Sequence, residues 1–389
     1  MPKPSHCSNP KCPNYYHPPV RWCVRFGSYQ TVAHGTVKRY RCRLCGRTVS
    51  NQTESIHYFA KRRLPLRAVW ASFVGGSSMR EVANRYRVSP MAIQYGILRL
   101  GRQAMAAHLV LLDQLKPRSR LVFDGLRSFV TSQDYPCDVT TVVGRSGEVI
   151  LTMTHTIMNR GGRMTDKQRE RIEAKRAGWQ PVKGATTRDI SLVVRELWDY
   201  LRPTALGGSI IDTDRHRIYA SVIARNPVCR HFRTVGMFEH IKTDSRLPRT
   251  YSNRLFPVNY VDRLLRHRVK EHTRETIAFG RHASMQMHRA WIFAYDHNCR
   301  RVYREKKPNR GVHAEQSAVE RQTIRRLNNQ FFDRRVRVAG LRVPESIRQV
   351  WLLKIPTPPV RWEHGQHGTS VRLPEYARRD LAEAYQQAG

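Results

Sequence analysis

The chain has 389 residues, of which 40% are hydrophobic, so it can form a substantial core in two or three domains. Its 69 lysines and arginines outnumber 30 aspartates and glutamates, and the net charge of +39 favours a nucleic acid as partner. The basic residues recur from Lys38 to Arg379, which argues against a neutral enzyme with one basic appendage. The chain lacks an apolar run of about 18 residues and a signal peptide, so we expect no membrane contact and a cytoplasmic protein with reduced cysteines.

Residues 1–55 contain two pairs of cysteines at the spacing of zinc ligands. Gly46 follows the second pair directly, where a zinc-binding knuckle requires a positive φ. A tetrahedron of four thiolates leaves no open position for chemistry, so we expect a structural zinc ribbon. Cys23 and His17 remain alternative ligands because the first pair is widely spaced. The four expected zinc ligands are Cys7, Cys12, Cys42 and Cys45.

Residues 56–112 have apolar positions at helical spacing, and SSMREVANRYRVSPMAIQYGILRL fits a helix-turn-helix. Ser89 can cap the second helix, with Pro90 at its first position. A glycine is usual near the turn, where this chain has Arg87, and an ordinary helical hairpin is the alternative. The side chains that we expect to contact DNA here are Arg62, Arg63, Gln94 and Arg99.

Residues 118–156 change to a β-branched composition. RLVFDGLRSFV predicts a strand, and CDVTTVVGRSGEVILTMTHTI predicts a hairpin with its turn at Gly147. A basic insertion is expected at about 157–205, although helical spacing returns in DISLVVRELWDYL.

The next part of the chain mixes strands and helices. SII predicts a short strand before a helix in HRIYASVIAR, FRTVGMF resembles a further strand, and helical spacing runs from Val258 to about Arg300. Such a mixture points to an α/β or α+β core over residues 118–300. Residues 301–389 form a basic extension that is interrupted by prolines, and the sequence leaves its role open.

Three aspartates stand out in this basic chain. Asp124 ends an apolar strand in LVFDGL, Asp214 follows the strand SII, and Asp262 lies on a predicted helix. Two strand ends and a facing helix can bring the three carboxylates together, and divalent cations would relieve their repulsion. Oxygen ligands suit Mg²⁺. Two such metals about 4 Å apart can activate a hydroxyl and stabilise the leaving oxygen of a phosphodiester.

The order of these motifs resembles the bacterial insertion-sequence transposases of the DDE class. The resemblance rests on YRCRLCGRT in the zinc ribbon, the helix-turn-helix, FDG, the D-x4-Y of Asp214 and Tyr219, and N-x2-D-R on a helix. It implies a ribonuclease-H-like catalytic domain in a multidomain protein. It also implies two Mg²⁺ or Mn²⁺ ions held by Asp124, Asp214 and Asp262, the last replacing the usual glutamate to give a DDD variant.

The same resemblance implies a transposase that binds terminal inverted repeats, cleaves the element's ends and joins them to target DNA. Such enzymes act as dimers or larger assemblies on paired ends, and in a bacterium this one would work at the nucleoid. Arg263, beside the third acid, is expected to contact DNA or to be solvated. Asp212, Glu271 and Glu275 are alternative acids. A non-catalytic DNA-binding regulator, a domesticated transposase, and a nuclease without strand transfer are the rival functions.

Overall fold

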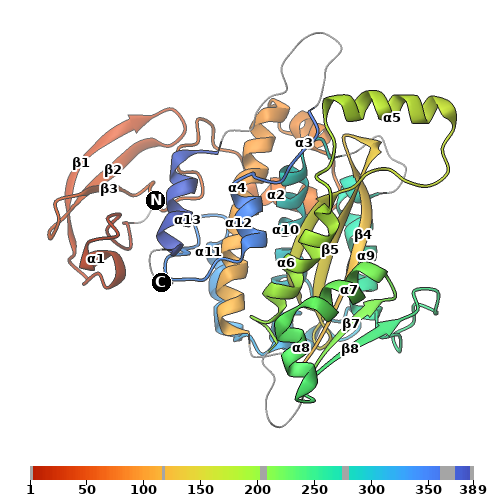
Figure 1. The fold of residues 1–389 in the computed structure, drawn as a ribbon. Helices are drawn as coiled ribbons and strands as arrows, with labels where there is room; N and C mark the ends of the chain where they lie inside the picture. The colour runs from red at the N-terminus through yellow and green to blue at the C-terminus, as the bar shows by residue number, and fades with distance from the viewer. Residues whose placement is uncertain (1–2, 116–118, 202–207, 274–279, 360–372, 386–389) are drawn as a thin grey trace.

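A layer of helices separates a small cysteine-rich module from a five-stranded mixed sheet (Figure 1). The computed structural model describes residues 3–115, 119–201, 208–273, 280–359 and 373–385. The predicted multidomain α/β architecture is confirmed at this level, with thirteen α-helices among the described residues.

The N-terminal module is a three-stranded antiparallel sheet in the order β1-β2-β3, with one short helix beside it. Its buried apolar cluster is small and consists mainly of cysteines with Trp22 and Val49. A core of this size gives little hydrophobic stabilisation, so the module needs an additional cross-link. Its elements are α1 (Pro13–Tyr16), β1 (Cys23–Thr31), β2 (Gly35–Cys42) and β3 (Thr48–Ser50).

The segment for which a helix-turn-helix is predicted contains two helices joined by a turn, α3 (Met79–Arg85) and α4 (Pro90–Gln114), which follow α2 (Leu66–Val74). Ser89 caps α4 by accepting a hydrogen bond from the N–H of Ala92, with Pro90 at the first helical position. Arg87 in the turn has a φ of 49°, a left-handed conformation that explains why a glycine is usual there.

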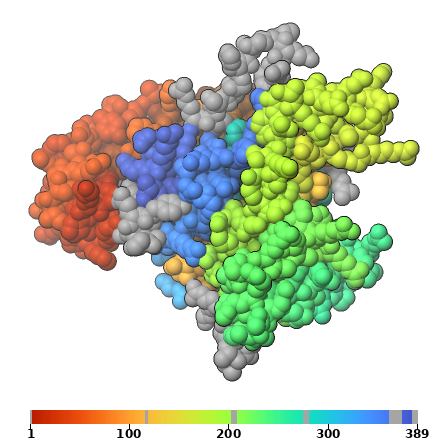
Figure 2. Space-filling view, in the orientation of Figure 1, coloured from red at the N-terminus to blue at the C-terminus, as the bar shows by residue number. Residues whose placement is uncertain are grey.

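The second helix is much longer than a DNA-reading helix requires. Helix α4 continues to Gln114 and buries side chains along most of its length. It packs against α10 (Ala283–Cys299), and its buried residues share one hydrophobic cluster with α11 (Arg321–Gln330) and α12 (Glu345–Trp351). The C-terminal extension therefore contributes to the same core, and Figure 2 shows it filling the surface between the N-terminal module and the sheet.

The sheet has the strand order β6-β5-β4-β7-β8. Strands β4, β5 and β6 are antiparallel neighbours, whereas β4, β7 and β8 run parallel. The predicted strand and hairpin are thus confirmed, and Gly147 in the β5–β6 turn has a φ of 79°. The bounds are β4 (Arg120–Val130), β5 (Ser132–Gly144), β6 (Ile150–Ile157), β7 (Ser209–Asp214) and β8 (Phe238–Thr243).

Each face of the sheet carries its own hydrophobic cluster. Helices α6 (Ala185–Leu197) and α7 (Arg217–Arg225) cover one face, and α9 (Phe256–Arg268) packs on β4 and β5 at the other. Helix α5 (Asp166–Gly178) projects from the body and buries only Ile172 (Figure 1). The remaining elements are α8 (Pro227–Thr234), α13 (Glu375–Tyr385), η1 (Lys270–His272), η2 (Pro308–Arg310) and η3 (Glu315–Ser317).

Two sequence predictions are corrected here. FRTVGMF is not a strand, because its first half ends helix α8, whose N-cap is Asn226, and β8 begins only at Phe238. The expected insertion at 157–205 is also too long, because α6 buries Val193, Val194 and other apolar side chains against the sheet.

The crossing of α4 and α10 generates a test of this core. A Cβ on Gly101 would lie 2.8 Å from the Cβ of His288, so Gly101→Val should overpack the contact and lower the free energy of unfolding by about 1–3 kcal/mol. Gly161→Val is the control, since nothing lies within 4 Å of a Cβ there. Urea unfolding followed by circular dichroism measures both variants, and equal stabilities would contradict the packing described.

Candidate active site and zinc centre

The parallel pairing of β4 with β7 places the first two aspartates at the same level of the sheet. Val122 is the partner of Asp212, so Asp124 and Asp214 each lie two residues further along neighbouring strands. Side chains two residues apart on a strand point to the same face. Asp124 does not end its strand as the sequence suggested, because β4 continues to Val130 beside β5.

Helix α9 brings the third aspartate to this face. Val122, two residues before Asp124, lies in the same buried cluster as Val258 and Val261 of α9, so Asp124 faces that helix. Beyond Asp262, the helix end is held on β4, because Arg266 donates to the carbonyl of Arg127 at 3.1 Å. The structure therefore brings Asp124, Asp214 and Asp262 to one region from three separate elements.

The carboxylates influence one another electrostatically. Burial and the neighbouring charges of Asp214 and Asp138 raise the pKa of Asp124 to about 7. Burial and Asp124 raise the pKa of Asp262 well above its usual range. The guanidinium of Arg249 opposes both shifts. Such mutual destabilisation of charge is the condition that a bound cation relieves.

Hydrogen bonds orient two of the three acids and leave polar atoms without partners nearby. Asp124 accepts from the N–H of Gly125, and Asp214 from the N–H of His216, both at 2.8 Å. The buried Oδ1 of Asp262 and Oγ1 of Thr141, the cross-strand partner of Asp124, have no hydrogen-bond partner within the described residues. Buried oxygens of this kind are costly unless they bind a further group, so this oxygen-rich donor set fits Mg²⁺.

The spacing of the acids bears on how many ions they would hold. Within the described part of the chain, only four cysteines form a group of three or more metal-binding side chains whose ligand atoms all lie within 4.8 Å of one another. The three aspartates are spread more widely than the shell of one ion. Two ions about 4 Å apart need a site of larger span, so this spacing is compatible with the two-metal expectation.

Two of the three acids considered as alternative metal ligands pair with arginines. Asp212 is 0% exposed and receives two hydrogen bonds from the guanidinium of Arg120, at 2.5 and 2.8 Å. Glu271 is buried and forms an ion pair with Arg289. Glu275 lies outside the described residues. The placement therefore favours Asp214 over Asp212 and Asp262 over Glu271.

The sequence analysis did not single out Asp138 or Arg249 as part of this region. Asp138 and the hydroxyl of Tyr219 lie against Gly125, where a Cβ would be 3.4 and 3.1 Å from them respectively. Burial, and then the charges of Asp124 and Asp214, raise the pKa of Tyr219. The register of the β4–β5 hairpin brings Asp138 close to Gly125, and no local sequence pattern predicts that register.

The zinc ligands come together as predicted. The thiol sulfurs of Cys7 and Cys45 are 3.5 Å apart and those of Cys12 and Cys42 are 3.9 Å apart, close to the edge of about 3.8 Å in a tetrahedron of Zn–S bonds. Gly46 has a φ of 70°. Cys23 is buried outside this group, and His17 is exposed, so neither replaces a ligand.

One cysteine of the cluster has surroundings that favour its thiolate, whereas burial raises the pKa of Cys7 and of Cys12. Burial acts to raise the pKa of Cys42, but main-chain N–H groups of Cys45 and Leu44 and the amide of Asn14 outweigh it and hold this pKa at about 6. Zinc binds the thiolate form. The four cysteines are thus suited to a closed, structural zinc site that leaves no position for a substrate.

The residues expected to contact DNA differ in their placement. Arg62, Arg63 and Arg263 are exposed, and Gln94 is half-buried on the first turns of α4. Arg99 donates to the carbonyls of Ile56 and Tyr58, at 2.8 and 2.7 Å. Its guanidinium therefore holds the segment before α2 against α4. The sequence analysis had expected this side chain to contact DNA.

No protein-family model matches this chain, and a comparison with curated proteins also finds no match. Among the residues that the structure describes, no helix is both long enough and apolar enough to span a bilayer.

Removing zinc should unfold the N-terminal module without unfolding the five-stranded sheet. We expect Cys42→Ser to lose the zinc measured by elemental analysis and to become sensitive to protease within residues 1–55, because its apolar cluster is too small to hold alone. Cys23→Ala is the matched control and should retain zinc, since this buried thiol is outside the ligand group. Loss of zinc in the control, or its retention in Cys42→Ser, would contradict the assignment.

The buried ion pair gives a second test. Asp212→Ala should lower the free energy of unfolding by about 3 kcal/mol, because it leaves the charge of Arg120 uncompensated at the sheet. Asp244→Ala removes one partner of the exposed pair with Arg215 and should cost less than about 1 kcal/mol. Thermal or urea unfolding separates these cases, and a stable Asp212→Ala variant would argue against a structural role for this aspartate.

Proposed function

We propose that this protein is a DNA transposase of the DDE class, in its DDD form, with Asp124, Asp214 and Asp262 as metal-binding catalytic residues. The observation that carries the proposal is their convergence from β4, β7 and α9 beside unpartnered buried oxygens. We further propose that the enzyme binds inverted repeats, cleaves them and joins the ends to target DNA, acting as a dimer or larger assembly at the nucleoid.

The sheet supports a ribonuclease-H-like assignment for the catalytic domain. Its first three strands form an antiparallel meander, and its last two run parallel to the first of these in the order β6-β5-β4-β7-β8. This arrangement, with helices on both faces, is the one expected for a ribonuclease-H-like core, and the first two acids lie on its central adjacent strands.

The chemistry that the chain's own residues perform follows from their positions. Main-chain N–H groups fix one oxygen of Asp124 and of Asp214, so these carboxylates meet a ligand in a defined orientation. Arg249 favours the charged forms of Asp124 and Asp262 and lies on an exposed segment where a phosphodiester could approach. Two bound divalent cations would supply the activation of water or a 3′-hydroxyl and the stabilisation of the leaving oxygen.

The cationic surface supports a long DNA path. The cysteine module and the sheet lie at opposite ends of the molecule in Figure 1. Exposed Arg62 and Arg63 precede the helix-turn-helix, whereas Arg263 stacks over Tyr260 with its guanidinium 5.5 Å from the ring, next to Asp262. A duplex that spans these regions would meet phosphate-binding residues at both ends, which agrees with a net charge of +39.

Substitution of one acid tests the catalytic proposal. Asp124→Asn should reduce Mg²⁺- or Mn²⁺-dependent nicking of a supercoiled plasmid that carries the genomic DNA flanking the coding sequence. The expected loss is at least about 10³-fold, because a missing metal ligand removes several kcal/mol of transition-state stabilisation. Binding to the same DNA, measured by gel shift, should be unchanged. Asp166→Asn on the exposed helix α5 is the matched control and should cleave like the wild type.

The pattern of outcomes separates the rival functions. Duplex binding by the wild-type protein without nicking under either metal would support a non-catalytic regulator or a domesticated transposase. Nicking without joined products would support a nuclease without strand transfer. Equal nicking by Asp124→Asn and the wild type would remove Asp124 from the proposed site.

A further inference from the structure

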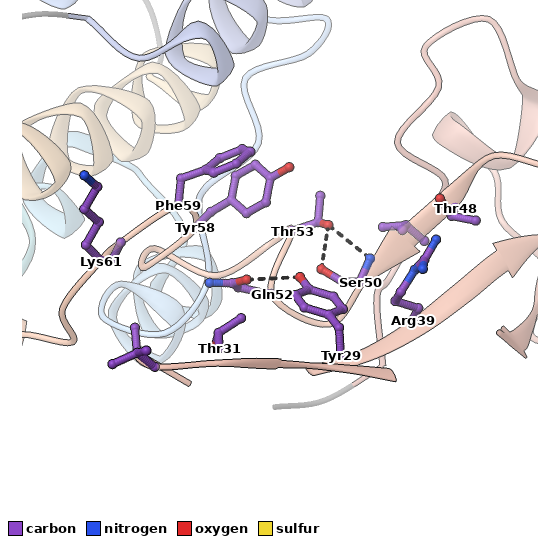
Figure 3. A pocket seen from close by; sticks show the side chains of 14 residues that line it. Tyr29, Thr31, Arg39, Thr48, Ser50, Gln52, Thr53, Tyr58, Phe59 and Lys61 are labelled. Carbon is purple, nitrogen blue, oxygen red and sulfur yellow. Dashed lines mark hydrogen bonds between the residues drawn. The ribbon is translucent and has the colours of Figure 1, made fainter. Parts of the chain in front are cut away.

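A groove between the N-terminal sheet and the segment before α2 has no role in the proposed catalysis. Its volume of about 770 Å³ lies within the range of roughly 300–1,000 Å³ typical of ligand sites, and it is open to solvent. Figure 3 shows Tyr58 and Phe59 on one side and Tyr29 on the other, with Lys61 and Arg39 toward the two ends. An apolar wall with cations at its ends suits an anionic ligand that has flat apolar groups.

Phe59 is the most exposed ring of the groove. It is 69% exposed, and its backbone has a φ of 57°, a conformation that aromatic residues adopt rarely. Tyr58 and Tyr376 brace it, with ring centroids 4.4 and 6.1 Å away, the latter nearly parallel. The ring is thus held in place while much of its surface remains in contact with water.

The opposite wall is also arranged by contacts within the protein. Tyr29 donates a hydrogen bond to the side chain of Gln52 at 3.3 Å, which fixes its ring, and Ser50 and Thr53 bond to each other at 3.2 Å. The groove is therefore preformed, and its hydroxyl groups add hydrogen-bonding capacity to the aromatic surface.

The charge beside the groove selects among possible ligands. Lys61 is followed by Arg62 and Arg63, all three exposed, and Arg39 comes from β2 on the other wall. Duplex DNA keeps its bases stacked inside and would meet only the cations. An unpaired base exposes a flat face that can stack on an aromatic ring while its neighbouring phosphates meet lysine and arginine.

We propose that this groove binds single-stranded nucleic acid, with an unpaired base stacked on Phe59 and the flanking phosphates held by Lys61 and Arg39. The site is separate from the aspartates and needs no divalent metal. It would give the protein an affinity for unpaired strands, such as those that form when DNA ends are opened, in addition to its affinity for duplex.

Fluorescence anisotropy of the full-length protein tests this inference in metal-free buffer. The probes are labelled oligo(dT) of about 12 nucleotides, within the range of roughly 4–16 per site, the matching oligo(rU), and a duplex hairpin. Phe59→Ala should weaken oligo(dT) binding roughly tenfold, the loss expected for one stacked base, and Phe59→Trp should restore it. Leu44→Ala is the control, since this exposed apolar residue of the same module is outside the groove.

The cations are tested through the salt dependence. Lys61→Ala should reduce the slope of log K against log salt for oligo(dT) by about 0.7, the value for one lost phosphate contact on a single strand. Lys11→Ala removes an equal charge from the same module outside the groove and should leave the slope unchanged.

The outcomes either support or overturn the inference. Equal loss of duplex and oligo(dT) affinity in Phe59→Ala, or no loss beyond that of Leu44→Ala in a protein with unchanged circular dichroism, overturns it. Binding of oligo(rU) but not oligo(dT) assigns the groove to RNA and overturns a role with opened DNA. Asp124→Asn should bind oligo(dT) like the wild type, so a failed cleavage experiment and a failed groove experiment remain distinguishable.

Discussion

The parallel pairing of β4 with β7 is the constraint on which the proposed site depends. Among the described residues, three pairs form this ladder, from Arg120 with Ile210 to Val122 with Asp212. The last pair has a buried carboxylate on one strand, and Arg120 neutralises it from the other. Because this ion pair is formed inside the sheet, Asp212 adds little net negative charge to the region that holds Asp124 and Asp214. A slip of β7 by one residue would turn Asp212 and Asp214 toward the face opposite to that of Asp124.

Burial and neighbouring carboxylates make the charged forms of Asp124 and Asp262 unfavourable. Asp124 and Asp262 are both partly shielded from water. Asp214 makes ionisation of Asp124 less favourable, and Asp124 makes ionisation of Asp262 less favourable. A stable protein tolerates such a cluster where other contacts over-determine the backbone. Here β4 is paired on both edges, and Arg266 anchors the end of α9 on it. The hydroxyl of Ser128 holds the following turn η1 on the same strand by donating to the carbonyl of Glu271. The sheet therefore holds the like charges close together, and in the proposed function bound cations would relieve their repulsion.

The parts that local sequence specifies were predictable. The cysteine pairs, the capped turn at Ser89 and the hairpin around Gly147 each depend on residues within a few positions of one another. The error at FRTVGMF was avoidable, because Asn226 followed by Pro227 is a helix-start signal that outweighs the strand-like composition after it.

The parts that tertiary packing specifies were not predictable from the sequence. The role of Arg99 depends on the carbonyls of Ile56 and Tyr58, which only a folded chain brings near. The length of α4 was hidden for a related reason. A helix buried on several sides lacks the polar stripe that usually marks its period. Asp138 was missed because a single aspartate in a strand carries no local sign that the hairpin register sets it beside Gly125.

The separation of the aromatic groove from the aspartates constrains how the two could act together. Figure 1 places the N-terminal sheet on one side of the helical layer and the aspartate-bearing strands on the other. A strand held in the groove therefore cannot be the short segment that meets the aspartates of the same molecule. It must be a more distant part of the same DNA or belong to a site presented to another copy. Helices α4, α10 and α12 share one hydrophobic cluster between the two regions, so in the proposed function this core would set the length of DNA that joins them.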